Sequence, residues 1–198
     1  LARVDASQLV DYAGPLGLPA LRQLLQRRAA ALGIDAPMEQ ILLTESGTHA
    51  VDLICRFLLK PGDCVLVDDP SYFNYHALLK AHQVQAVGVP YTHTGPDLDA
   101  FAQALQAHSP RLYITNSGLH NPTGAVLSAS TAHRLLGLAE HSELVIVEDD
   151  IFADFELHPA PRLAALDGLS RVIHVGSFSK TLSAASRCGY IAVSYTHL

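Results

Sequence analysis

The chain has few cysteines, few basic residues and no long apolar run. Its three cysteines, Cys55, Cys64 and Cys188, form an odd and scattered set, which favours a reduced, cytoplasmic setting over a disulfide framework. Thirteen lysines and arginines stand against 19 acidic residues, for a net charge of -6. Because no basic stripe appears, this segment is a poor candidate for binding nucleic acid by itself. No apolar run is long enough to cross a bilayer, so we expect no membrane span.

Metal-binding motifs and targeting signals are also missing. The eleven histidines include no H-E-x-x-H motif and no Cys-His cluster at ligand spacing, so we expect no metal site. No signal peptide opens the sequence. The chain begins at Leu1 instead of a methionine, and we therefore expect the true N-terminus to lie upstream.

What the sequence does contain is the composition of a folded core. It is 49% hydrophobic and 16% charged over 198 residues, within the usual range of one to two domains. Apolar residues at helical spacing predict helices, with Pro19 in a first turn, Asp97 as an N-cap and Ser128 before a further stripe. The predicted helical segments are 19–32, 51–59, 97–105 and 128–139.

Short apolar runs alternate with these helices. They predict strands buried on both faces, as parallel sheets require. The alternation indicates an α/β fold, with a mainly parallel sheet sandwiched by helices. The predicted strands are 64–67, 84–89, 112–114, 144–147 and 172–175, and the run 189–192 reads as one more.

Polar clusters follow four of these strands. In open α/β sheets, ligands gather beyond the carboxyl ends of the strands. We therefore expect the clusters to converge on one site. They are 68–70, 115–117, 148–150 and 177–180.

The last cluster carries a chemically specific combination. Lys180 lies next to Ser179 and seven residues before Arg187, and Ser177 ends the preceding run. A buried lysine amine can condense with an aldehyde, and hydroxyls with an arginine can hold a phosphate. Pyridoxal 5'-phosphate carries both groups, and we expect Lys180 to meet it in a dry crevice.

Three further motifs fit the same cofactor, although each has a plainer interpretation. Ser46-Gly47-Thr48 precedes a helical stripe and could be an anion cradle or an ordinary N-cap. Tyr72 could stack on a flat ring or be a half-buried turn residue. Asn121 could donate to a phenolate oxygen, or its turn could be chosen for shape alone.

The acidic run at 148–150 is the fourth such motif. One carboxylate of Glu148-Asp149-Asp150 could pair with a protonated ring nitrogen and keep the ring able to accept electrons. The plainer interpretation is a solvated acidic loop, which three acids in a row favour for at least one of them.

Taken in order, these motifs make the chain resemble the fold type I pyridoxal-phosphate enzymes of the aspartate aminotransferase superfamily (class I/II), from Tyr12 to Val193. In overall sequence it is most similar to the aminotransferase-like domains of MocR-type regulators. In those proteins a GntR-type winged helix precedes the aminotransferase-like domain. The segments that carry this likeness are 40–44, 61–63, 148–150 and 177–182, together with Tyr12, Gly17, Leu21 and Arg22.

The resemblance implies roles around the cofactor ring. Lys180 would form the Schiff base and later move the proton. Asp149 would pair with the pyridine nitrogen, with Asp150 as the alternative. Asn121 would hydrogen-bond the ring O3', and Tyr72 would stack on the ring.

The resemblance also implies a phosphate site and a homodimer. Tyr12 looks like the tyrosine that reaches the partner subunit's phosphate, so two copies would share their sites. The residues that would hold the phosphate within one subunit are Ser46, Gly47, Thr48, Ser177, Ser179 and Arg187.

The chain departs from the family pattern at its end. The family's arginine for the substrate carboxylate belongs to a C-terminal small domain that this sequence does not reach. We interpret residues 1–192 as a truncated large, cofactor-binding domain, lacking an N-terminal region and the small domain. Residues 193–198 look like read-through of a sequencing adapter and not native protein. We expect this fragment alone to be inactive.

Two functions remain open, with a cofactor-free structural relative as a third. The first is an aminotransferase that moves an amino group between an amino acid and a 2-oxo acid. The alternative is the effector-sensing domain of a MocR/GntR-type transcriptional regulator, which would bind the same cofactor and an amine or amino acid with weak or no turnover. The residues present are shared by both.

A second departure gives a testable prediction. Phe152 stands where the family has a tyrosine aimed at O3', and phenylalanine cannot donate. The O3' phenolate of the cofactor then has one stabilising hydrogen-bond donor fewer. We therefore expect the pKa of the lysine-cofactor Schiff base to be higher than in relatives with the tyrosine. A pH titration of the cofactor's visible absorbance measures it, and complete deprotonation near pH ~6 would contradict the prediction.

Overall fold

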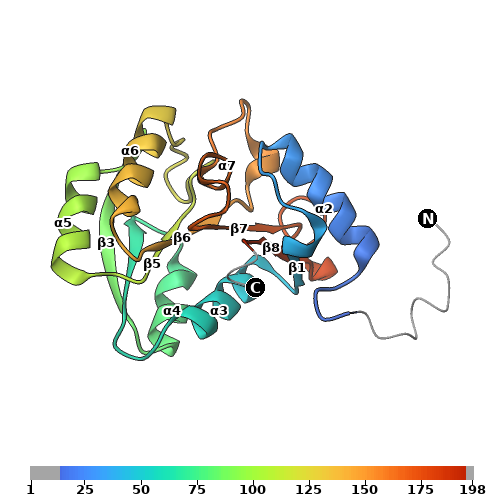
Figure 1. Cartoon of the computed structure of the whole chain (residues 1–198), viewed down its shortest axis with the longest axis horizontal. Helices are drawn as coiled ribbons and strands as arrows, with labels where there is room; N and C mark the ends of the chain where they lie inside the picture. The colour runs from blue at the N-terminus through green and yellow to red at the C-terminus, as the bar shows by residue number, and fades with distance from the viewer. Residues whose placement is uncertain (1–13, 195–198) are drawn as a thin grey trace.

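The computed structural model describes residues 14–194, which form one eight-stranded sheet with helices on both faces (Figure 1). The strand order is β1-β8-β7-β6-β5-β2-β3-β4. Five central strands, β3, β2, β5, β6 and β7, run parallel. At one end of the sheet β8 runs antiparallel to both β7 and β1, and at the other end β4 runs antiparallel to β3. The α/β fold class with a mainly parallel sheet is confirmed.

The element bounds are as follows. The strands are β1 Ile41–Thr44, β2 Cys64–Asp69, β3 Gln85–Thr92, β4 Gly95–Pro96, β5 Leu112–Thr115, β6 Val145–Asp149, β7 Val172–Ser177 and β8 Gly189–Ala192. The α-helices are α2 Pro19–Ala31, α3 Gly47–Leu58, α4 Phe73–Ala81, α5 Leu98–His108, α6 Ala129–Glu140 and α7 Leu163–Asp167. Short 3-10 turns are η1 Met38–Gln40, η2 Ala153–Phe155 and η3 Ala184–Ser186.

The predicted helix starts are confirmed by their capping bonds. The Asp97 carboxylate accepts from the backbone amides of Asp99 and Ala100 at 3.0 and 2.9 Å, and Ser128 accepts from the Thr131 amide at 3.1 Å. Each cap satisfies amides that have no partner inside the first helical turn. Pro19 occupies the first turn of α2, where its missing N–H costs nothing.

Two expectations about the elements need correction. Strand β3 was expected to be buried on both faces, but only Val89 of its residues is buried. Its outer neighbour is the two-residue strand β4, so most of it lies at an edge. Helix α4 was not predicted, because only Tyr75 and Leu79 of its nine residues are buried and the apolar stripe is too short to stand out.

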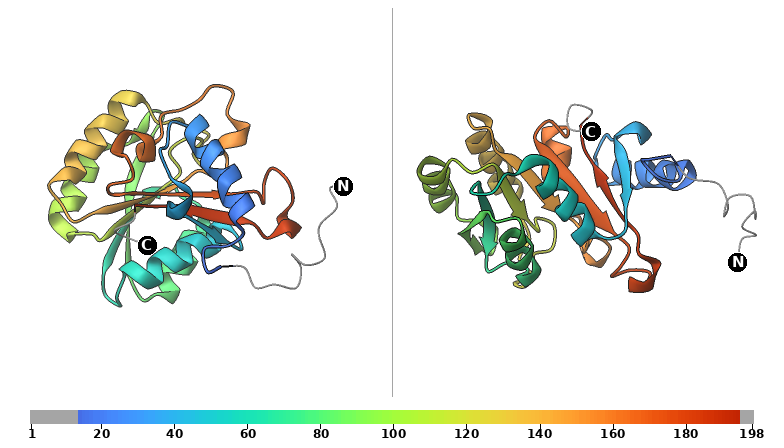
Figure 2. Two further views of the ribbon diagram at one scale, coloured as in Figure 1. Left: turned by 45° about the vertical axis from the view of Figure 1, so that its right-hand side comes forward. Right: turned by 90° about the horizontal axis from the view of Figure 1, so that it is seen from below.

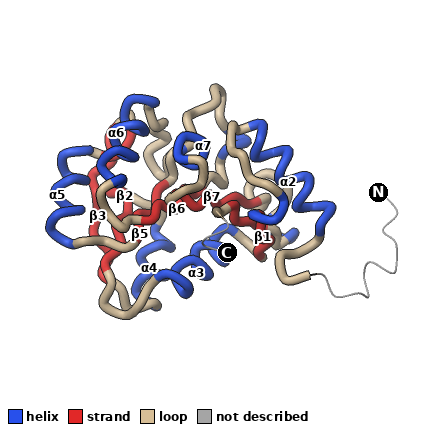
Figure 3. Tube along the Cα trace, viewed as in Figure 1, coloured by secondary structure: helices blue, strands red, loops and turns tan. Residues whose placement is uncertain are grey.

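The helices divide into two layers that cover opposite faces of the sheet (Figures 1 and 3). Helices α3 and α4 cover one face, and α2, α5, α6 and α7 cover the other. Two apolar cores follow from this arrangement. The first contains Ala50, Val51, Ile54, Tyr75 and Leu79 against β2, β5 and β7, and the second contains Leu25, Phe101, Leu135 and Leu163 against the opposite face.

The carboxyl ends of β2, β5, β6 and β7 carry buried polar residues, as the sequence predicted. Asp68, Asn116, Asp149 and Ser177 are each no more than 9% exposed. Such groups are stable in a core only when they are hydrogen-bonded or paired. Behind β6 the pairing forms a charge network around Asp150.

Arg162 and His174 hold Asp150 in that network. The Arg162 Nε donates to the Asp150 Oδ2 at 2.8 Å, and its Nη2 pairs with Glu156 at 2.9 Å. The His174 Nε2 lies 3.1 Å from the same Asp150 oxygen. Burial would raise the pKa of Asp150, but His174 and Arg162 outweigh that effect and hold this pKa below its usual value.

Glu148 ties the start of α7 to the end of β6. Its carboxylate accepts the amides of Leu163 and Ala164 at 2.7 and 2.9 Å and the hydroxyl of Ser117. Because Glu148 is fully buried, the pKa of its carboxyl is raised. The two flanking acids of the 148–150 run are therefore committed to structure, and neither forms a solvated acidic loop.

Within residues 14–194, no helix is long and apolar enough to cross a membrane. Over the same range, no group of histidine, cysteine and carboxylate side chains is placed to hold a metal ion.

The charge network predicts a large effect of one substitution. Arg162→Met removes the cation shared by the Asp150 and Glu156 carboxylates and leaves Asp150 only its contact with His174, so we expect the free energy of unfolding to fall by about 3–5 kcal/mol. Urea denaturation measures it. Arg134→Met, at an exposed position of α6, is the matched control and should change stability by less than about 0.5 kcal/mol. Equal stabilities of the two variants would contradict the assignment.

Candidate active site

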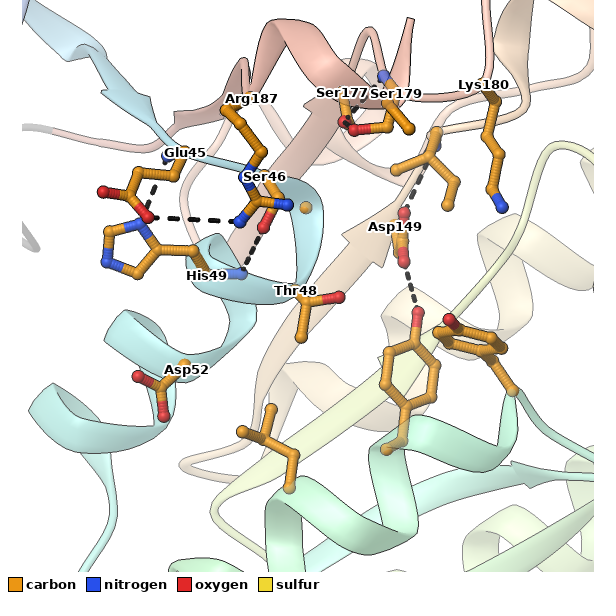
Figure 4. A pocket seen from close by; sticks show the side chains of 16 residues that line it. Glu45, Ser46, Thr48, His49, Asp52, Asp149, Ser177, Ser179, Lys180 and Arg187 are labelled. Atoms are coloured by element: carbon orange, nitrogen blue, oxygen red, sulfur yellow. Dashed lines mark hydrogen bonds and ion pairs between the residues drawn. The ribbon is translucent and has the colours of Figure 1, made fainter.

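A cavity of about 580 Å³ opens beyond the ends of β6 and β7, against the N-termini of α3 and α4 (Figure 4). It brings together nine of the residues predicted from the sequence. They are Ser46, Gly47, Thr48, Tyr72, Asp149, Ser177, Ser179, Lys180 and Arg187. Figure 4 shows that the side chains of Ser46, Thr48, Asp149, Lys180 and Arg187 come from separate segments and face the same space.

The start of α3 forms one wall. Ser46 is its N-cap, and the hydroxyl accepts the His49 amide at 3.1 Å. Gly47 packs closely on the strand ends, since a Cβ there would lie 3.1 Å from the Ile151 side chain. The close approach leaves the first amides of the helix at the cavity wall, where the helix dipole favours an anion.

Hydroxyl and guanidinium donors from the loop after β7 face that wall. The Ser177 hydroxyl bonds the Ser179 hydroxyl at 3.0 Å and accepts the Ser179 amide at 3.2 Å. Arg187 reaches in from the end of the same loop and lies 4.0 Å from the carboxylate of Glu45. Together the two walls offer donors and positive charge to one anion.

Asp149 lies at the floor of the cavity and is 5% exposed. Its Oδ2 accepts the hydroxyl of Tyr75, and its Oδ1 accepts the Ile151 amide at 3.2 Å. Burial raises the pKa of Asp149 to about 6, although the Tyr75 and Ile151 bonds act in the opposite direction. The carboxylate is therefore mostly ionised at pH 7.

The structure separates Asp149 from Asp150. Asp149 faces the cavity, whereas Asp150 points into the network of Arg162 and His174 on the other side. Side chains alternate along a strand, so neighbours at a strand end face opposite ways. The geometry makes Asp149, and not Asp150, the acid available to a ligand.

Tyr72 and Tyr75 form an aromatic pair at the start of α4. Their ring centroids are 5.5 Å apart with the planes at 90°, and both rings line the cavity. Sequence reasoning found Tyr72 and missed Tyr75, the donor to Asp149. The spacing of three residues places both on one helical face, but this signal needs α4 to be recognised first.

Two predicted residues, Asn121 and Phe152, lie outside the cavity lining, and a third cannot be placed. Asn121 is half-buried in the turn at 120–124 and is not among the lining residues, although the turn itself is closed by a bond of 2.7 Å from the Gly124 amide to the His120 carbonyl. Phe152 is half-buried and tilted against Phe155, outside the lining. Tyr12 lies outside the described residues.

The expectation of a buried Lys180 is wrong for this chain. Lys180 lines the cavity but is exposed. It sits in the loop between β7 and β8, where residues 182–187 are all exposed, so little surrounds its amine. We name this segment, residues 178–188, the lysine loop.

The cavity also contains residues that the sequence did not single out. Glu45, His49 and Asp52 lie along the cavity side of α3 and the turn before it. The Glu45 amide donates to the His49 Nδ1 at 3.2 Å, and Asp52 pairs with Arg56 and His82 at 2.8 Å each. The spacing of three to four residues is the only sequence signal for this row.

Comparisons with known proteins place this geometry in a family. The family model described as aminotransferase class I and II matches residues 2–197. The uncharacterized HTH-type transcriptional regulator YdfD of Bacillus subtilis is 30% identical over 183 residues, which cover 91% of this chain and 38% of that protein.

Solved structures agree. An archaeal alanine:glyoxylate aminotransferase matches with a TM-score of 0.88 and 31% identity, over 96% of this chain and 49% of its own. The Pyrococcus horikoshii kynurenine aminotransferase, solved with PMP, matches with a TM-score of 0.85 and 28% identity. The match covers 94% of this chain and 48% of that one. The chain spans about half the length of these two aminotransferases and 38% of the length of YdfD. With the family model covering nearly all of it, the chain belongs to the aminotransferase class I and II family.

Proposed function

We propose that this chain is the cofactor-binding part of a pyridoxal-phosphate-dependent aminotransferase, which moves an amino group between an amino acid and a 2-oxo acid. The observation that carries the proposal is the meeting of Lys180, Asp149 and an anion cradle in one cavity. An amine, an acid for a ring nitrogen and a phosphate site are what this cofactor requires.

The residues present fit the group. Ser46, Gly47, Thr48, Ser177, Ser179 and Arg187 would hold the phosphate. Asp149 would pair with the ring nitrogen, Tyr72 would stack on the ring, and Asn121, as the resemblance implies, would donate to O3'. The P. horikoshii neighbour was solved with PMP, which supports the same cofactor here.

When bound, the cofactor supplies an aldehyde for the amine and a ring that accepts electrons. Lys180 would hold the group through that aldehyde, and its amine would serve as the general base and acid that moves a proton. An ionised Asp149 would keep a proton on the ring nitrogen. The Tyr75 hydroxyl would fix the Asp149 carboxylate in place.

The proposal extends to organisation. We propose that residues 1–192 belong to the large, cofactor-binding domain, that Tyr12 contacts the phosphate of a partner subunit in a homodimer, and that residues 193–198 are not native. Within that last segment, Val193 is buried and its amide bonds the Gln40 carbonyl at 3.1 Å, so one added residue continues the packing of β8.

A second candidate is favoured by the curated relatives. YdfD and NorG of Staphylococcus aureus, 28% identical over 184 residues, are both named HTH-type transcriptional regulators. In that role the same cavity would bind the cofactor and sense an amine or amino acid with weak or no turnover. The upstream reading frame separates the two. A basic winged helix before Leu1 supports the regulator, whereas a start codon shortly upstream supports the enzyme.

The lysine assignment has a direct test. We expect borohydride treatment of the complete gene product with pyridoxal 5'-phosphate to leave one reduced pyridoxyl adduct, on Lys180. Peptide mapping by mass spectrometry locates it. Lys180→Ala should abolish the adduct, while Lys60→Ala and Lys80→Ala, the other two lysines and both exposed, should retain it. An adduct on Lys60 or Lys80 in the wild type, or none, would overturn the proposal.

The acid assignment predicts opposite pH dependences for two neighbours. Because the Asp149 pKa rises from 3.8 to about 6 on folding, its contribution to stability is present below pH ~4 and is lost as the pH rises through 6. The loss is about 3 kcal/mol. We expect Asp149→Asn to flatten this decline in urea denaturation of the cofactor-free protein.

Asp150→Asn is the matched comparison. The Asp150 pKa is lowered on folding, so its contribution is present above its unfolded pKa and is lost as the pH falls. The Asn variant should therefore lose stability at pH 7. The same pH profile for both variants would refute the separation of their roles.

A further inference from the structure

Arg28 of α2 reaches two loops that carry candidate active-site residues. Its Nη2 pairs with the Asp154 Oδ1 at 2.6 Å, and its guanidinium carbon lies over the Phe178 ring at 5.7 Å from the centroid. Helix α2 lies at the β1–β8 end of the sheet, far from α5 and α6 (Figure 2). The side chain is 31% exposed, so both contacts are partly shielded from water.

Phe178 is the anchor of the lysine loop, two residues before Lys180. Its amide donates to the Cys188 carbonyl at 3.0 Å, which closes the loop. Its carbonyl accepts the amides of Leu182 and Ser183 at 2.9 and 3.3 Å. A change in the position of Phe178 therefore moves the backbone on both sides of Lys180.

The Phe178 ring rests on a platform built by Tyr190. The two ring centroids are 6.3 Å apart, and Tyr190 pairs in register with Gly176 across β7 and β8. A Cβ at position 176 would overlap the Tyr190 ring, so only glycine leaves room for it. Arg28 lies over the Phe178 ring and also interacts with the Tyr190 side chain.

Asp154 belongs to the other loop. It lies in η2, five residues after Asp149 and directly after the turn that leaves β6. The lysine loop leaves the next strand of the sheet, β7. One guanidinium thus joins the segment after the acid to the segment that holds the lysine.

We propose that Arg28 is a positioning residue that ties the lysine loop to the segment after Asp149 and so fixes where the Lys180 amine lies over the cavity. The proposal rests on the proposed function for what Lys180 and Asp149 do. It does not need that function for the tether itself. The two contacts of Arg28 support each other, because the ion pair with Asp154 keeps the guanidinium in place over the Phe178 ring.

The physical need for a tether comes from the exposure of the lysine loop. Residues 182–187 are exposed, and most of the loop's hydrogen bonds are internal. Segments of this kind open locally at low free-energy cost. A contact from outside the loop, on its anchor residue, limits that opening more than another internal bond would.

Hydrogen exchange of the complete gene product without cofactor tests the tether. Arg28→Met keeps a helix-compatible chain of similar length but removes the charge. We expect the amides of Leu182 and Ser183 to exchange about 2- to 30-fold faster, the range that loss of a cation-π contact implies. Amides of β5 and β6 should not change. Arg27→Met, the exposed neighbour on α2, should leave the loop as in the wild type.

Two more variants separate the contacts. Phe178→Leu keeps an apolar anchor without an aromatic face, so it should speed exchange as Arg28→Met does, and the double variant should add little more. Asp154→Asn removes the ion pair alone and should give less than about a fivefold change. Unchanged loop exchange in Arg28→Met, or fully additive effects in the double variant, would overturn the tether.

The last readout connects the tether to Lys180. With pyridoxal 5'-phosphate and borohydride, the Arg28→Met protein should form the Lys180 adduct several-fold more slowly than the Arg27→Met protein. Equal rates would show that the tether does not position Lys180. If the wild type forms no adduct at Lys180, the proposed function fails, while the exchange measurement still decides the tether separately.

Discussion

The structure depends on burying three consecutive carboxyl groups at the end of one strand. Glu148, Asp149 and Asp150 are 0%, 5% and 6% exposed, and a buried charge is costly unless it is paired or hydrogen-bonded. The fold meets this cost in three ways. Amides at the start of α7 hold Glu148, Arg162 and His174 hold Asp150, and a phenol and one amide hold Asp149. Of the three, only Asp149 lines the cavity.

This difference leaves Asp149, at the end of β6, as the one acid of the three that a ligand in the cavity could contact. Glu148 and Asp150 do not line the cavity, and protein donors already occupy their carboxylates. Asp149 keeps an unneutralised charge at the floor of a cavity, and its raised pKa reports the cost. A cationic ring nitrogen would relieve that cost. The binding of such a group and the stability of the fold are therefore linked through one side chain.

Much of this arrangement could be predicted from the sequence, for identifiable reasons. Strand runs such as 144–147 are apolar throughout and are followed by polar residues, so the parallel sheet and the convergence of its carboxyl ends followed directly. Asp97 and Ser128 identified helix starts because capping depends on local chemistry. Tyr75 and Arg28 could not be found, because their importance lies in contacts 74 and 126 residues away along the chain. The exposure of Lys180 likewise depends on how few residues surround its loop.

The same reasoning explains why the fold alone does not separate an enzyme from a sensor. Both would need a cofactor held by its phosphate and ring, and the residues proposed for this lie on strand ends and helix starts of the sheet. Turnover asks more of the lysine, which must leave the cofactor, take up a proton and return it to another atom. A lysine on an exposed loop can make those movements only if the loop itself returns to one position. On the proposals made above, the firmness of the lysine loop is one property in which an enzyme and a sensor would differ.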